Sequence, residues 1–113
     1  MTNTLKGETT VNIGEETYGV LMGLNAWRQY CEAEGIDLGE FQERLGTQPL
    51  SVVPRIVHYG IKTYNLRNDI DTEAPSSEKI AAFVLEDDGQ IMRLMEAINN
   101  ANVLGEDQAA EEK

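Results

Sequence analysis

The chain has 113 residues, which is enough for one domain and too short for most multidomain enzymes. Hydrophobic residues make up 41% of it and charged residues 26%, a mixture that is ordinary for a globular protein with a packed core. Nine lysines and arginines against twenty aspartates and glutamates leave a formal net charge of -11. This charge repels phosphate backbones and anionic lipid headgroups, so nucleic acids and membranes are poor candidates as partners.

The cysteine content and the first residues favour an intracellular protein. Cys31 is the single cysteine and cannot form an internal disulfide, and the first residues lack the apolar run of a signal peptide. No apolar segment approaches the roughly 20 residues that a membrane-spanning helix needs. We therefore expect an intracellular protein that has no membrane association.

An N-terminal β-hairpin is predicted by two short runs of alternating hydrophobicity. Val11 and Ile13 alternate with polar residues in the first run, 8–13, and a second alternating run spans 17–22. Gly14 begins the turn between them. Because a lone hairpin is marginal in water, one of its faces should lie against the helices that follow.

Two helices are predicted directly after the hairpin. The first should span residues 24–34, and Gly35 suits a left-handed C-cap behind it. Its apolar face consists of Leu24, Trp27 and Cys31, with Tyr30 on the flank. Asp37 can cap the second helix, which is short and should end at Gly46. The stripe of this second helix consists of Leu38, Phe41 and Leu45.

A third helix is predicted to start near residue 51 and to be the most buried of all. Ser51 is a plausible N-cap, because Pro54 would then lie in a first turn, where its missing N–H is tolerated. Gly60 lies in the middle of the apolar face although glycine costs about 1 kcal/mol relative to alanine there. Close approach of another backbone is the simplest reason for this glycine. The apolar face consists of Val53, Ile56, Val57, Gly60, Ile61 and Tyr64, and the other helices should pack around it.

Two further helices are predicted after a polar loop at residues 68–75. Ser76 or Ser77 can cap the fourth helix, and residues 86–89 should break it. Its buried stripe consists of Ile80, Phe83 and Val84. The last helix should end around residues 100–103. Its stripe consists of Ile91, Leu94, Met95 and Ile98.

These elements predict an α+β fold with an N-terminal β-hairpin, about 8–22, packed on a mainly helical body of about five helices, about 24–103. We expect a single domain over residues 1–104. Residues 105–113 have no apolar anchor and are predicted to form a flexible, disordered acidic tail.

The acidic clusters do not form a recognisable metal site. If Gly89 were the glycine of an EF-hand loop, Val84 and Met95 would stand where carboxylates are required. Asp69 and Asp71 could chelate a hard cation weakly, but a solvated acidic loop is the favoured interpretation.

No catalytic constellation is predicted either. His58 is the single histidine, and without a second ligand or nucleophile we interpret it as a surface or boundary residue. Cys31 shares an apolar stripe and is interpreted as a small buried hydrophobe. Ser76 and Lys79 have the spacing of serine–lysine enzymes, but helix capping explains them. We expect no catalytic residue, no metal and no cofactor, and therefore no enzyme.

Two methionines of the last helix are candidate partner-binding residues. Met92 falls off the stripe that contains Met95 and widens the apolar arc of the helix. Unbranched, polarizable methionines repack around varied apolar surfaces, which suits contact with a helical partner. The alternative interpretation is that both residues fill the core.

Four segments carry packing residues in a distinctive order. They are Lys6-Gly7-Glu8 before the hairpin, Gly-Leu-Asn-Ala-Trp-Arg at 23–28, Cys-Glu-Ala-Glu-Gly-Ile at 31–36 and Val-Pro-Arg-Ile-Val-His-Tyr-Gly-Ile-Lys at 53–62. In this order they resemble the tail assembly chaperone family of tailed bacteriophages and gene transfer agents. The resemblance covers roughly residues 6–100.

The resemblance implies a non-enzymatic chaperone that acts in virion morphogenesis. Such a protein binds and solubilises the tape measure protein, a long helical chain, and promotes polymerisation of the tail tube protein around it. It would act in the host cell cytoplasm and be absent from the mature virion. Two alternatives stay open: a structural tail tube or tail completion protein, and an acidic inhibitor that mimics DNA.

Overall fold

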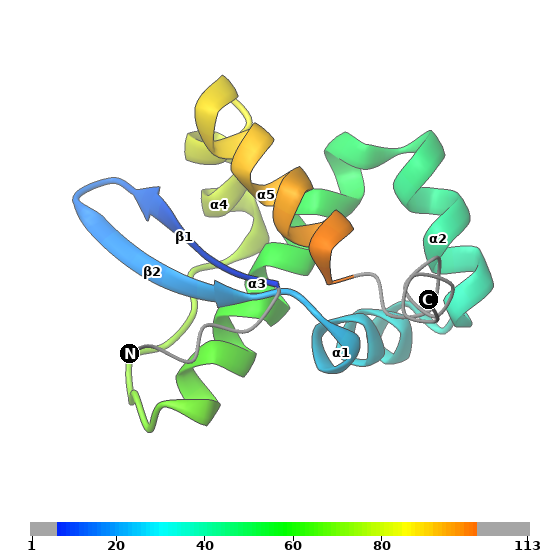
Figure 1. Cartoon of the computed structure of the whole chain (residues 1–113), viewed down its shortest axis with the longest axis horizontal. Coiled ribbons are helices and arrows are strands. Elements are labelled where there is room, and N and C mark those ends of the chain that lie inside the picture. The colour runs from blue at the N-terminus through cyan, green and yellow to red at the C-terminus, as the bar shows by residue number, and fades with distance from the viewer. Residues whose placement is uncertain (1–6, 102–113) are drawn as a thin grey trace, which may run out of the picture.

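The computed structural model describes residues 7–101, in which a two-stranded antiparallel hairpin packs on five helices (Figure 1). The elements are β1 (Glu8–Ile13), β2 (Glu16–Leu21), α1 (Leu24–Glu34), α2 (Leu38–Thr47), α3 (Pro49–Arg67), α4 (Ser77–Val84) and α5 (Asp88–Asn100). The predicted α+β fold is confirmed. The acidic tail predicted at 105–113 lies outside the described residues. No helix within 7–101 is long and apolar enough to cross a bilayer.

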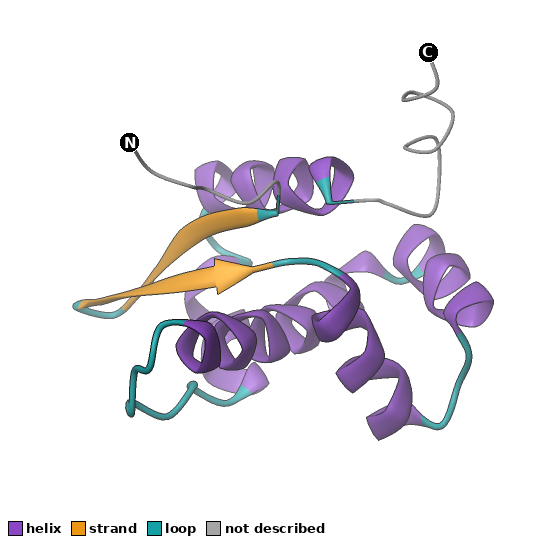
Figure 2. Cartoon of the chain, turned by 60° about the horizontal axis from the view of Figure 1, so that its bottom comes forward, coloured by secondary structure: helices purple, strands orange, loops and turns teal. Residues whose placement is uncertain are grey.

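Helices cover the hairpin, as the sequence predicts. Gly14 has a positive φ of 68° in the turn, and Val11 of β1 pairs with Tyr18 of β2. The fully buried hairpin side chains are Val11, Ile13 and Val20, and Met22 directly after β2 joins them. α3 packs on β2, whereas α4 and α5 pack on β1. Figure 2 shows the hairpin between α5 on one side and the other helices on the other.

A side chain completes the outer edge of β1. The amide of Gln90, which is only 4% exposed, accepts a hydrogen bond from the Asn12 N–H at 2.6 Å and donates one to the Asn12 carbonyl at 3.0 Å. One primary amide thus satisfies both backbone groups of a residue at the edge of the sheet. Leaving these groups without hydrogen bonds beneath a helix would cost free energy. This pair fixes the start of α5 on the hairpin.

α3 is the most buried helix, but its predicted start is wrong. It begins at Pro49, a residue type that favours the first helical position, and Gln48 rather than Ser51 is its N-cap. Pro54 therefore lies inside the helix and removes the N–H that the Leu50 carbonyl would normally accept. The Leu50 residue is 69% exposed, so water can serve that carbonyl instead.

The close approach predicted at Gly60 is confirmed. A Cβ atom on this residue would lie 2.7 Å from Cγ1 of Val20 and 3.2 Å from the backbone oxygen of Leu21. α1, α2, α4 and β2 pack around α3 as expected, whereas α5 packs chiefly on β1 and α4.

Two residues assigned to buried stripes are exposed. Leu24 begins α1 and is 50% exposed, because the helix instead buries Ala26, Trp27 and Tyr30. Phe83 is 42% exposed, since the short α4 buries only the narrow face formed by Ile80 and Val84. In each helix the spacing of apolar residues predicts an apolar arc, but only one side of that arc is buried against the other elements.

The capping predictions are largely confirmed. Gly35 is left-handed at the end of α1 with φ 70°, and the Asp37 side chain accepts from the Glu40 N–H at 2.8 Å. Ser76, one of the two serines considered, caps α4. The break predicted at 86–89 is partly wrong, because Asp87 is the N-cap of α5 and the helix begins one residue later.

Candidate partner-binding surface

α5 presents the predicted candidate Met92 to solvent. Met92 is 69% exposed, whereas Leu94 and Ile98 of the same helix are at most 4% exposed. Core packing is therefore excluded for Met92. Met95 is half-buried and packs against the core, so the structure places the two predicted residues in different environments.

Large apolar side chains are also exposed elsewhere in the described part of the chain. These are Leu24 of α1, Leu50 and Leu66 of α3, Ile70 of the following loop and Phe83 of α4. Scattered exposed apolar residues are ordinary on protein surfaces. Two of them are not scattered, because Leu66 and Ile70 line the same groove.

The groove lies between the C-terminal half of α3 and the loop that leads to α4. Its volume is about 670 Å³. α3 contributes His58, Lys62 and Leu66 to its lining, and the loop contributes Ile70, Asp71 and Glu73. This groove was not predicted from the sequence.

Two α3 side chains hold the loop in place. The side-chain amide of Asn65, a residue that is 9% exposed, donates to the Thr72 carbonyl at 2.8 Å, and the backbone carbonyl of Asn65 accepts from the Ile70 N–H at 2.9 Å. Nδ1 of His58 lies 2.7 Å from the Pro75 carbonyl. A carbonyl oxygen only accepts, so Nδ1 must carry the proton in this contact. His58 is thus a half-buried boundary residue, as predicted, and it anchors the loop.

The two acidic residues considered as weak ligands of a cation, Asp69 and Asp71, lie on this loop. Asp69 and Asp71 are both exposed, and Asp69 adopts a positive φ of 56°, which aspartate tolerates better than most residues. Within residues 7–101 no three histidine, cysteine, aspartate or glutamate side chains come together as metal ligands.

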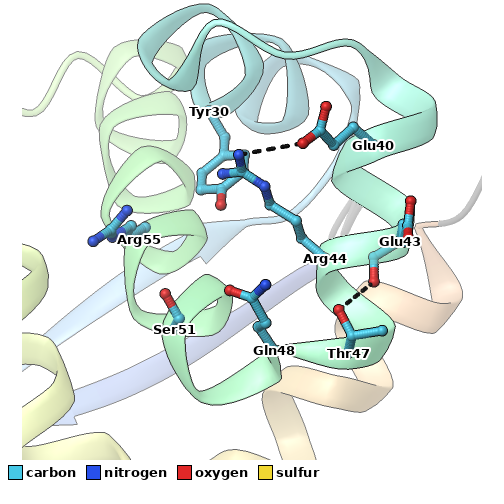
Figure 3. Close-up of a pocket in the computed structure, with 8 residues that line it drawn as sticks. All are labelled: Tyr30, Glu40, Glu43, Arg44, Thr47, Gln48, Ser51 and Arg55. Atoms are coloured by element: carbon cyan, nitrogen blue, oxygen red, sulfur yellow. Dashed lines mark hydrogen bonds and ion pairs between the residues drawn. The ribbon is translucent and has the colours of Figure 1, made fainter.

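A second pocket, of about 390 Å³, lies where α1, α2 and the start of α3 meet (Figure 3). Arg44 extends from α2 toward Tyr30 and forms ion pairs with Glu34 at 3.2 Å and Glu40 at 3.4 Å. Arg55 pairs with the other oxygen of Glu34 at 3.0 Å. Since carboxylates already engage both guanidinium groups, we interpret this pocket as a junction that ties three helices together.

The same contacts raise the pKa of the Arg44 guanidinium above its ordinary value. The hydrogen bond to the Tyr30 hydroxyl is the main cause; partial desolvation opposes the shift, and Glu34 and Glu40 add to it. The surroundings of Arg44 therefore favour its charged form.

Cys31 is expected to react slowly with alkylating reagents. It is half-buried rather than fully buried, and burial, with a smaller contribution from the Asp37 carboxylate, raises the pKa of its thiol above the ordinary value of 9.0. Only the thiolate is reactive, so the rate of reaction with iodoacetamide should be low near neutral pH, should increase about tenfold with each pH unit, and should level off only at a pH above 9.0.

The control for this experiment is Asp37→Asn, which preserves an N-cap and removes the nearby charge. It should speed alkylation slightly, because burial, the larger cause, remains. The thiol of the unfolded chain ionises at a lower pH than that of the folded chain, so folding stability should also fall as the pH rises above 9.0. If Cys31 is labelled at neutral pH as fast as a free cysteine, its thiol does not have a raised pKa.

Comparison of the chain with protein-family models, with curated proteins and with solved structures finds no match.

Proposed function

We propose that this protein is a non-enzymatic tail assembly chaperone that binds and solubilises the phage tape measure protein and promotes tail tube polymerisation around it. The observation that carries the proposal is the exposure of Met92 on α5, an adaptable apolar side chain that the core does not use. The order of packing residues through the hairpin, α1 and α3, which resembles that of the family, supports the same function.

The charge of the chain suits this role. A tape measure protein is a long helical chain whose apolar stripes remain exposed until the tail assembles, and exposed stripes of this kind aggregate. A small partner that covers part of a stripe and brings a net charge of -11 makes neighbouring complexes repel each other. Several weak contacts along one client would keep release easy during assembly. On this proposal the protein acts in the host cytoplasm and leaves before the virion is complete.

The direct test is co-expression with the tape measure protein of the same tail. The chaperone should keep the tape measure protein in the soluble fraction and elute with it in size-exclusion chromatography, and it should be absent from finished particles. If the wild-type chain fails to bind any tape measure segment, or if it persists as a fixed component of purified virions, the proposed function is wrong.

Met92→Glu should weaken capture of the tape measure protein by about tenfold, because a carboxylate replaces an apolar contact in the complex. The melting temperature should stay nearly unchanged, since Met92 is 69% exposed in the free protein. Met95 is half-buried, so a glutamate there would also destabilise the fold and gives a less specific test.

Leu50→Glu is the matched control, because Leu50 has the same exposed fraction, 69%, but lies on α3. Binding of tape measure segments by both variants can be compared by pull-down and titration. If Leu50→Glu reduces capture as much as Met92→Glu does, α5 is not the contact surface.

A further inference from the structure

The groove between α3 and the 68–76 loop combines apolar and acidic groups in one place. Leu66 is 77% exposed and Ile70 is 41% exposed, although both are large aliphatic side chains and line the same groove. Burying the exposed parts of these side chains against a partner is favourable, whereas those parts contribute nothing to folding while they remain in water. The groove therefore offers an apolar contact area that the fold itself does not use.

The charges beside this apolar area are mostly negative. Asp69, Asp71 and Glu73 follow one another at alternate positions of the loop, and the last two line the groove. Within residues 7–101 none of the three forms an ion pair. Lys62 and His58 line the α3 wall of the groove, opposite these acids. The Nζ of Lys62 lies 5.7 Å from the ring centre of Tyr59, and the Nδ1 of His58 is hydrogen-bonded to the Pro75 carbonyl.

The groove is already shaped in the free protein. The hydrogen bonds of Asn65 and His58 fix the loop on α3 at both ends of its course. A partner that enters a preformed groove does not have to order the loop, which lowers the entropic cost of binding. A volume of about 670 Å³ accommodates a few large side chains from one face of a partner that lies across the groove.

We propose that this groove docks a basic amphipathic helix of another polypeptide. An aliphatic side chain of that helix packs on Leu66 and Ile70, and a lysine or arginine three or four positions away lies beside Asp71 and Glu73. A second copy of the chain suits the groove poorly, because two molecules with a net charge of -11 repel each other. This site is separate from Met92 and does not depend on the identity of the partner proposed above.

The probe is a labelled synthetic peptide of about 18 residues with leucines on one helical face and lysines beside them. We expect it to bind the full chain in fluorescence anisotropy titrations, with an affinity that falls as salt is added. Two control peptides should bind much more weakly: one with glutamates in place of the lysines, and one with asparagines in place of the leucines.

Groove variants should weaken binding of the leucine–lysine peptide. Asp71→Asn combined with Glu73→Gln should raise the Kd by about tenfold, and Leu66→Asn by a similar factor. Circular dichroism should show an unchanged fold, since all three residues are exposed in the free protein.

Matched controls lie away from the groove. Glu15→Gln combined with Glu43→Gln removes two exposed acids, one in the hairpin turn and one on α2, which is on the opposite side of the molecule from the loop (Figure 1). This variant and Leu50→Asn should change the Kd by less than about twofold.

Three results would overturn the proposal. The first is equal weakening by the groove acids and the control acids, which would mean attraction to the overall charge. The second is a change of molecular mass on Leu66→Asn in analytical ultracentrifugation, which would mean that the groove joins two copies of this chain. The third is a loss of peptide binding on Met92→Glu with none on the groove variants; that result would leave the proposed chaperone function intact.

Discussion

Replacing Phe41 with alanine should lower the free energy of unfolding by about 3 to 5 kcal/mol, because a large ring would leave a fully packed site. Phe41 is 1% exposed and is the single fully buried residue of α2. Its ring centre lies 5.2 Å from that of Trp27 and 5.5 Å from that of Tyr30, in the tilted arrangements that aromatic pairs favour.

The effect should be large because α2 has few other attachments. Leu38 and Leu45 of the same helix are only half-buried, and its ion pairs through Arg44 are partly exposed to water. Without the Phe41 ring, α2 should separate from α1 and α3 well before the rest of the molecule unfolds.

Urea unfolding measures this effect. Trp27, the single tryptophan, reports on the aromatic cluster by its fluorescence, and circular dichroism reports on the whole helical body. Phe83→Ala is the matched control, since Phe83 is the other phenylalanine of the chain and is 42% exposed. Its loss should cost less than about 1 kcal/mol. Equal losses for the two variants would show that the aromatic cluster does not hold α2.

Local signals in the sequence were sufficient to predict most of the fold. Hairpin alternation, the left-handed Gly35 and the Asp37 cap each depend on a few neighbouring residues, and each is confirmed. The predicted start of α3 was wrong because two sequence signals compete in this segment. Ser51 favours a cap, but Pro49 favours the first helical position, and the structure follows the proline.

Periodicity was less informative about which apolar residues are buried. Leu24 and Phe83 lie on the predicted faces of their helices, yet each belongs to a side that the other elements cover only in part. Which side is covered depends on the crossing of helices far apart in the chain. Gln90 was missed for the same reason, because its partner Asn12 is 78 positions away.

The two candidate sites differ in how far the sequence could predict them. Met92 departs from a clear stripe in the sequence, and in the structure it is exposed on α5. The groove depends on the loop folding back onto α3 through His58 and Asn65, which no local pattern specifies. The available signal was weak: two aliphatic residues, Leu66 and Ile70, on either side of a polar turn.

Gly60→Ala should destabilise the protein by about 2 to 3 kcal/mol, although alanine is the better helix former. The added Cβ would lie 2.7 Å from Cγ1 of Val20, which is fully buried in β2 and is β-branched, so its side chain has little freedom to rotate. The backbone oxygen of Leu21, 3.2 Å away, blocks the other direction. The gain of about 1 kcal/mol in helix propensity is therefore smaller than the cost of moving β2 away from α3.

Gly46→Ala should have the opposite sign. Gly46 is also helical, in α2, but an added Cβ would meet nothing within 4 Å, so only the propensity gain of about 0.5 to 1 kcal/mol remains. Thermal and urea unfolding of the two variants, measured side by side, separates the propensity of the residue from the space around it. If both alanine variants are more stable than the wild type, the contact of α3 with β2 at Gly60 is loose enough to accept a methyl group. The hairpin would then not be tightly packed on α3.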